Sequence, residues 1–119
     1  MKRKNRLTHS NDFKRVRRKG KSYSHPLAVM IVGKGLEEES RAGIVVTKSL
    51  GGAVQRNHTK RQLRVIITSV LPELTEKVDL LFIPREPASR ASFHEIQSAV
   101  LVLLGKAGLI VSDNNGSGR

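Results

Sequence analysis

Apolar residues recur at helical spacing in three segments of the chain and form short runs in three others. The spacing predicts a helix that starts between Thr8 and Ser10 and ends at Lys19, a second over Ala53–Val70, and a third that begins at Phe93. The runs predict strands over Leu27–Val32, Ala42–Thr47 and Val78–Ile83, and a further short strand fits near Ser22–Ser24. The order α-β-β-α-β-α predicts an α+β fold in which helices pack on a small sheet.

Local signals add detail to two parts of this fold. Ser92 and Glu95 have the spacing of a capping box at the start of the third helix. The apolar positions of that helix predict that it packs on the sheet, and they are Phe93, Ile96, Val100, Leu103 and Leu104. The first two long strands are close in sequence, so we expect Ala42–Thr47 to return beside Leu27–Val32 as a hairpin.

The length of 119 residues favours one folded domain, which we expect to cover residues 1–111. Residues 1–6 are rich in lysine and arginine and predict a flexible basic arm. Residues 112–119 have the composition of a disordered tail.

The second helix carries the densest group of cations. At about 100° per residue, Arg56, Lys60 and Arg64 form one i, i+4 row, and Asn57 and Arg61 form a second row beside it. The apolar residues that follow, Leu63, Ile66, Ile67 and Val70, are expected on the other side of the helix, facing the core.

This row of like charges is unfavourable for the protein alone. Each i, i+4 pair of cations destabilises a helix by roughly 0.2–0.5 kcal/mol, and no acidic residue occurs between Ser40 and Pro72 to offset it. A polyanion along the row would remove the repulsion and release counterions. The alternative is a solvated helix face, although such faces usually mix the two signs of charge.

The charge of the whole chain also points to a polyanionic partner. The sequence has 22 basic and 10 acidic residues, a formal net charge of +12. Residues 1–36 alone contain 11 basic residues and one acid. This asymmetry indicates an oriented nucleic-acid-binding surface, with acidic membrane lipid as the weaker alternative.

Several other classes of site are excluded or unsupported. There is no cysteine, which excludes disulfides and thiolate metal sites, and the four histidines lack metal-ligand spacing. His58 lies two residues from Lys60, but a His/Lys ribonuclease site would need a second acid or base, and none is evident. No apolar run approaches the ~20 residues of a membrane span, and no signal peptide is evident. We therefore expect a cytoplasmic protein with no catalytic centre and no metal ligands of its own.

The segment Ala53-Val54-x-Arg56-Asn57-x-x-Lys60-Arg61-x-x-Arg64 resembles the signature of the protein subunit of bacterial ribonuclease P. The resemblance continues outside this helix and covers about Arg6 to Leu104. Similar to that family are Arg6-Leu7, Asp12-Phe13-x-x-Val16 with Gly20, Gly43-Ile44-Val45-Val46-Thr47-Lys48, and Ile83-Pro84-Arg85.

The resemblance implies a fold and a division of labour. The basic helix would lie in a left-handed β-α-β crossover, which is an unusual hand. The RNA subunit would hydrolyse precursor tRNA with Mg²⁺ and remove the 5′ leader. The protein would bind both RNAs, lower the Mg²⁺ requirement and need no protein partner.

The resemblance also implies two sets of site residues. One set faces the catalytic RNA: Arg56, Asn57, Lys60, Arg61 and Arg64. The other lines a cleft for the single-stranded leader between the first helix and the sheet: Phe13, Arg17, Val29, Ile31 and Lys48. Phe13 has an equal alternative role as a core anchor of the first helix.

Two positions depart from the family pattern. Arg17 stands where the family often has an aromatic residue, and Lys48-Ser49 stands where it often has two cations. A guanidinium can also stack on a base. Two rival functions remain open on the residues alone: a ribosomal or ribosome-assembly protein, and a duplex-DNA-binding protein that places the basic helix in the major groove.

Overall fold

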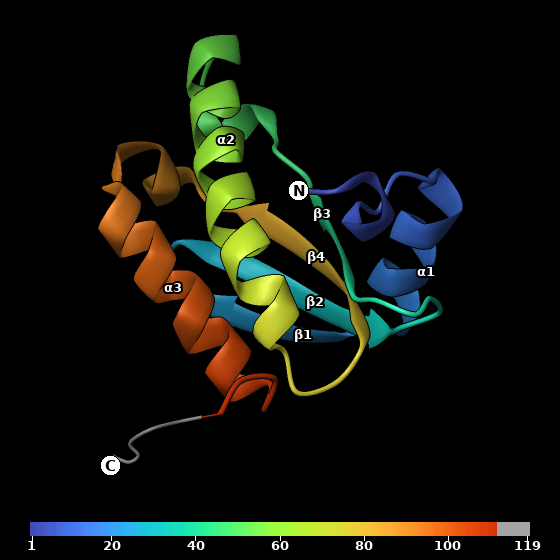
Figure 1. Ribbon diagram of the computed structural model, residues 1–119. Helices are drawn as coiled ribbons and strands as arrows, with labels where there is room; N and C mark the ends of the chain where they lie inside the picture. Colours follow the sequence, from blue (N-terminus) through green and yellow to red (C-terminus); the bar gives the residue numbers. More distant parts are fainter. Residues whose placement is uncertain (112–119) are drawn as a thin grey trace.

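Four strands form one mixed sheet with helices on both faces. The computed structural model describes residues 1–111, and the expected tail lies outside them. The helices are α1 (Ser10–Lys19), α2 (Ala53–Val70) and α3 (Phe93–Lys106), and the strands are β1 (Lys21–His25), β2 (Ala28–Lys34), β3 (Arg41–Ile44) and β4 (Val78–Pro84). The strand order is β1-β2-β4-β3. Figure 1 shows α2 and α3 in front of the sheet and α1 behind its edge.

The predicted fold class and the three helices are confirmed, and the extra short strand exists as β1. The predicted hairpin between Leu27–Val32 and Ala42–Thr47 is wrong. The hairpin is formed by β1 and β2, whereas β3 pairs in parallel with β4. Strands that are neighbours in sequence usually pair, but here β4 lies between β2 and β3. The first five of the seven residues of β4 are all buried, as expected for a central strand.

The connection from β3 through α2 to β4 is a crossover between adjacent parallel strands. In Figure 1 both strands run towards the upper left, α2 lies in front of them, and β4 lies to the left of β3 when viewed along that direction. This arrangement is the left-handed sense that the family resemblance implies. It is rare, because about 98% of such connections are right-handed.

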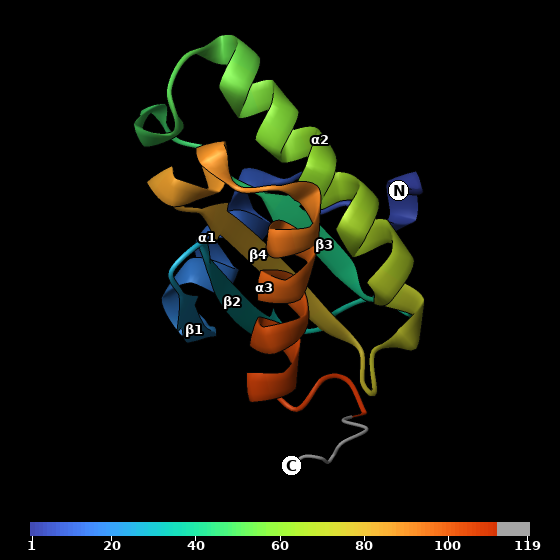
Figure 2. The same ribbon diagram turned by 90° about the vertical axis from the view of Figure 1, so that its left-hand side faces the viewer.

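Alternate residues of the sheet contribute to two separate cores. Met30, Leu80 and Phe82 pack with α2 and α3 on one face, and all three are completely buried. Ile31 and Leu81 pack with Val16 of α1 on the other face. Figure 2 shows the sheet between α1 on one side and α2 with α3 on the other. The helices are therefore held at fixed positions on opposite faces of one sheet.

Helix α3 begins at the expected capping box. The Ser92 hydroxyl accepts a hydrogen bond from the Glu95 backbone N–H, and the Glu95 carboxylate accepts one from the Ser92 N–H. Four of the five predicted core positions of α3 are buried. Phe93, the first residue of the helix, is the exception at 40% exposed.

The N-terminal segment, expected to be a flexible arm, packs against the sheet instead. Leu7 is buried, and its backbone N–H donates to the Ala42 carbonyl oxygen at 2.9 Å. The Asn5 side-chain amide donates to the Ser40 carbonyl oxygen at 3.0 Å. Burying a leucine side chain contributes about 1.5–3 kcal/mol, which opposes the repulsion among the basic residues around it.

A buried ion cluster joins α1 to the edge of the sheet. Asp79 of β4 has no exposed side-chain surface, and it accepts hydrogen bonds from Arg15 at 2.5 Å and from Arg41 at 2.9 Å. Asp12 also accepts from both arginines, at 3.3 and 3.4 Å. Partial burial alone would raise the pKa of Asp12, but the hydrogen bond from Arg15 and the charge of Arg41 outweigh it and hold this pKa below its ordinary value.

We expect Asp79→Ala to lower the free energy of unfolding by about 3 kcal/mol, because it removes the buried carboxylate that both partly buried arginines bind at the shorter distances and leaves them only Asp12. Glu86→Ala is the matched control, since it removes the carboxylate of an exposed ion pair with Arg90 and should cost less than about 1 kcal/mol. Urea unfolding followed by circular dichroism measures both. Equal losses in the two variants would contradict the structural role given to Asp79.

The lowered pKa of Asp12 predicts how one part of the stability depends on pH. An unfolded aspartate has a pKa of about 3.9, so below neutrality the unfolded chain takes up this proton before the folded chain does. The contribution is complete above the unfolded pKa and is lost as pH falls through the folded pKa. We expect Asp12→Asn to cost about 1–3 kcal/mol at pH 7, with a difference from wild type that shrinks below about pH 4 in urea titrations. A difference that stays constant down to pH 2 would contradict this account.

Candidate nucleic-acid interface

The start of α2 is set by the turn that precedes it. Leu50 is buried and anchors the short 3₁₀ turn Lys48–Leu50. Gly51 then has φ of +112°, a backbone conformation that favours glycine, and a Cβ there would lie 2.2 Å from the Gln55 side-chain oxygen. Gly52 is the N-cap, with no side chain to occupy the first backbone N–H groups of α2.

The faces of α2 differ in one respect from the sequence prediction. Thr59, Leu63, Ile66 and Ile67 are buried, as a core-facing stripe requires. The cationic row lies beside this stripe and not opposite it, because Arg56 and Lys60 are each half-buried. The remaining predicted residues of the helix, Asn57, Arg61 and Arg64, are exposed. The cations therefore extend from the edge of the core across the outer surface of α2.

None of these cations has an acidic partner within residues 1–111. The ion pairs there involve Lys4, Arg15, Arg41 and Arg90, and no side-chain hydrogen bond of Arg56, Lys60, Arg61 or Arg64 occurs. The first turn of α2 has no acidic residue either, so the positive end of the helix dipole adds to their charge. The result is a surface of positive potential suited to phosphate groups.

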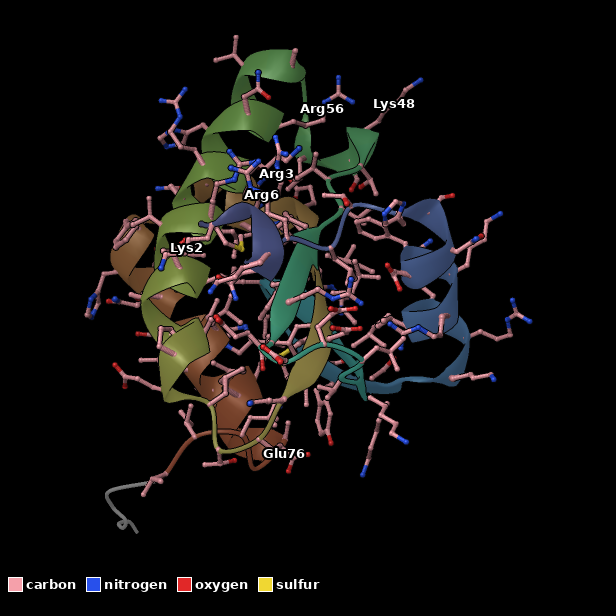
Figure 3. All side chains as sticks on the ribbon, turned by 45° about the vertical axis from the view of Figure 1, so that its right-hand side comes forward. Lys2, Arg3, Arg6, Lys48, Arg56 and Glu76 are labelled. Carbon is pink, nitrogen blue, oxygen red and sulfur yellow. The ribbon has the colours of Figure 1, made fainter. Side chains whose placement is uncertain are left out.

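The N-terminal segment extends this surface, which sequence reasoning missed. Figure 3 shows Lys2, Arg3 and Arg6 beside α2, with Arg56 and Lys48 beyond them. The signal that could have revealed this packing is Leu7, a lone apolar residue directly after the basic segment.

Three of the predicted cleft residues come together where α1 packs on the sheet. Phe13, Val29 and Ile31 belong to the smaller apolar cluster on that face of the sheet. Phe13 and Val29 are half-buried, whereas Ile31 is only 6% exposed. The Phe13 ring lies over Gly43, where an added Cβ would be 2.7 Å from a ring carbon. Phe13 therefore anchors α1 and keeps part of its ring exposed.

The other two predicted cleft residues, Arg17 and Lys48, lie outside this cluster. Both are exposed, and Figure 3 shows Lys48 extending from the surface above the end of β3. Arg17 belongs to a group of exposed α1 cations without ion pairs in the described part of the chain; the others are Lys14, Arg18 and Lys19. The apolar floor under α1 is thus bordered by positive charge.

Neither a group of metal ligands nor a membrane-spanning helix occurs among the described residues. Within them, no three or more histidine, cysteine or acidic side chains are grouped so that they could hold a metal ion. None of the helices in residues 1–111 has the length and apolar character needed to cross a membrane.

A mixed sheet with a left-handed crossover, whose helix carries cations without acidic partners among residues 1–111, defines a small basic α+β protein with a surface suited to nucleic-acid phosphates. The family model for ribonuclease P matches residues 1–108. The chain belongs to this family, and it is a protein component of ribonuclease P, the endoribonuclease that processes the 5′ end of precursor tRNA.

Individual relatives agree with this assignment over nearly their whole length. The ribonuclease P protein component of Herpetosiphon aurantiacus is 43% identical over 109 residues, which cover 92% of this chain and 89% of the relative. That of Dehalococcoides mccartyi is 39% identical over 114 residues, covering 96% and 93%. The solved structure of the Staphylococcus aureus protein superposes with a TM-score of 0.81 at 30% identity, covering 90% of this chain and 98% of that chain.

We expect Arg64→Ala to weaken RNA binding without destabilising the protein. The change removes one repulsive i, i+4 pair with Lys60, so the free energy of unfolding should stay equal or rise by about 0.2–0.5 kcal/mol. The slope of log affinity against log salt should fall by about one if Arg64 contacts one phosphate. Lys77→Ala, an exposed cation beyond the far end of α2, is the control. An equal slope in wild type and Arg64→Ala would contradict the contact.

Proposed function

We propose that this protein is the RNA-binding, non-catalytic subunit of ribonuclease P and that the RNA subunit performs the hydrolysis with Mg²⁺. The observation that carries the proposal is the set of cations on α2 that lack acidic partners in the described part of the chain, on the fold of the ribonuclease P protein family. The proposed partners are the catalytic RNA and precursor tRNA, with no further protein required. The proposed location is the cytoplasm, where a bacterial cell matures its tRNA.

The proposed mechanism of α2 is electrostatic. Two RNAs that meet at an active site repel each other through their phosphates, and cations between them reduce this repulsion. Arg56, Lys60 and Arg64 run along one side of α2, and Asn57 and Arg61 lie next to them, so they would contact the catalytic RNA. Cations fixed on a folded helix replace part of the bound metal ions, which would lower the Mg²⁺ requirement of the holoenzyme.

The proposed role of the surface between α1 and the sheet is to hold the 5′ leader in position. The leader would lie between α1 and the sheet, with a base against the exposed part of Phe13 and against Val29. Ile31 would support this floor from below because it is buried. Arg17 and Lys48 would contact the leader phosphates at the two borders. A leader held in place reduces the entropy lost when the scissile bond reaches the catalytic RNA.

Reconstitution tests this function. Purified protein, a bacterial ribonuclease P RNA and precursor tRNA are combined at limiting Mg²⁺, and cleavage is compared with RNA alone and protein alone. We expect the protein to stimulate cleavage at the mature 5′ end and to cleave nothing by itself. No stimulation with a competent RNA would contradict the proposal and favour a ribosomal role.

Variants of the α2 cations test the electrostatic part separately. We expect Lys60→Ala and Arg61→Ala to lower the rate of cleavage mostly at low Mg²⁺, since added Mg²⁺ can replace the lost screening. Lys77→Ala again serves as the control. Unchanged activity of both α2 variants at low Mg²⁺ would show that this helix does not have the role given to it.

A further inference from the structure

A pocket of about 260 Å³ lies where the N-terminal segment, β3 and α2 meet. Its apolar wall includes Leu7, Phe13 and Ile44. Its basic wall is formed by Arg6 from the N-terminal segment together with Lys60 and Arg64 from α2. The pocket therefore connects the two surfaces described above, since Phe13 belongs to the α1 side and both α2 cations belong to the basic helix.

We propose that this pocket binds one RNA nucleotide, with the phosphate on Arg6, Lys60 and Arg64 and the base against the Phe13 side. Three cations and no acid line the pocket, a composition that matches a phosphodiester and its charge-assisted hydrogen bonds. Gly43, which has no side chain, lines the pocket together with Phe13, and a Cβ there would lie 2.7 Å from a carbon of the Phe13 ring. An aromatic side chain can stack on a base that has left its own stack.

The size of the pocket limits the ligand. A volume of about 260 Å³ is slightly below the range of about 300–1,000 Å³ typical of sites for larger small molecules. It has room for a single nucleotide and not for a folded stretch of RNA. The rest of the RNA chain would therefore pass over the protein surface and place one nucleotide inside the pocket.

The packing of the N-terminal segment supports this assignment. The segment brings Lys2, Arg3 and Arg6 beside α2 (Figure 3), and none of these three has an acidic partner within residues 1–111. This crowding is unfavourable without an anion. Backbone hydrogen bonding and burial of Leu7 nevertheless hold Arg6 beside Ala42 in a bridge to β3. A phosphate between Arg6 and α2 would reduce the repulsion among these cations, because each of them is attracted to the same negative charge.

A second and larger pocket provides a contrast. It has a volume of about 420 Å³ and lies between the N-terminus and the end of α2. Its lining includes both Glu39 and Glu76 as well as Lys2 and Lys77. The mixed charges are poorly suited to a polyanion, so the positive pocket beside Phe13 is the better candidate for RNA.

The phosphodiester has two sources, the precursor leader and the catalytic RNA. The inference rests on the proposed function, because both RNAs belong to it. The test compares Arg6→Gln with Arg3→Gln, which removes the same charge from the same segment at a residue that does not line the pocket. Binding is measured for the protein with catalytic RNA alone, and for the assembled holoenzyme with precursor tRNA and with leaderless tRNA.

We expect Arg6→Gln to lose about tenfold in affinity in one of these assays, the effect of one charge-assisted hydrogen bond. Arg3→Gln should lose only about twofold, through the general reduction in charge. A loss confined to precursor tRNA identifies the leader as the source, and a loss in protein–RNA assembly identifies the catalytic RNA. Equal losses for the two variants in every assay would overturn the proposal.

A double-variant cycle tests whether Arg6 and Lys60 share one phosphate. If they do, the affinity lost by Arg6→Gln/Lys60→Gln is smaller than the product of the two single losses, whereas Arg3→Gln/Lys60→Gln is multiplicative. Multiplicative losses in both cycles would contradict a shared phosphate.

A last readout needs neither RNA subunit nor substrate. Adenosine 5′-monophosphate is titrated into the full-length protein, and the amide NMR signals of Gly43 and Ile44 are followed. We expect saturable shifts in wild type that weaken about tenfold in Arg6→Gln. Absence of shifts in wild type would overturn the nucleotide pocket even if reconstitution succeeds, and shifts without reconstituted activity would contradict only the proposed function.

Discussion

The insertion of β4 between β2 and β3 is the constraint on which the rest of the structure depends. Side chains of β4 alternate between the two cores, so Leu80 and Phe82 hold α2 and α3 while Leu81 holds α1. The same strand provides Asp79, which joins α1 to β3 through Arg15 and Arg41. One central strand therefore sets the positions of the basic helix and of the α1 side relative to each other.

The second principle of the structure is a separation of stabilising and binding surfaces. Apolar burial on one stripe of α2 supports the helix, and the cations beside that stripe add repulsion that the fold tolerates. The N-terminal segment repeats this arrangement, because Leu7 is buried while Arg6 stays exposed at the surface. In both places the binding of RNA phosphates would offset a local electrostatic cost, as the proposed role of an RNA-binding subunit requires.

Local features of this fold could be predicted from the sequence, and long-range ones could not. The bounds of α2 and the capping box at Ser92 follow from nearby residues, and both are confirmed. The partner of β3 depends on β4, which lies more than thirty residues further on, so adjacency in sequence suggested the wrong pairing. The ion cluster of Asp79 and the packing of Arg6 also depend on distant residues. The sequence signal of the ion cluster is Asp79, a single acidic residue inside the otherwise apolar β4.

The central claim is that α2 faces the catalytic RNA while the α1 side faces the leader. The sequence contains no cysteine, so Asn57→Cys and Arg17→Cys each introduce one thiol that can carry a photo-crosslinker in the holoenzyme with precursor tRNA. The account predicts crosslinks from position 57 to the catalytic RNA and from position 17 to the 5′ leader. Crosslinks from position 57 to the leader, or from both positions to the same RNA, would contradict it.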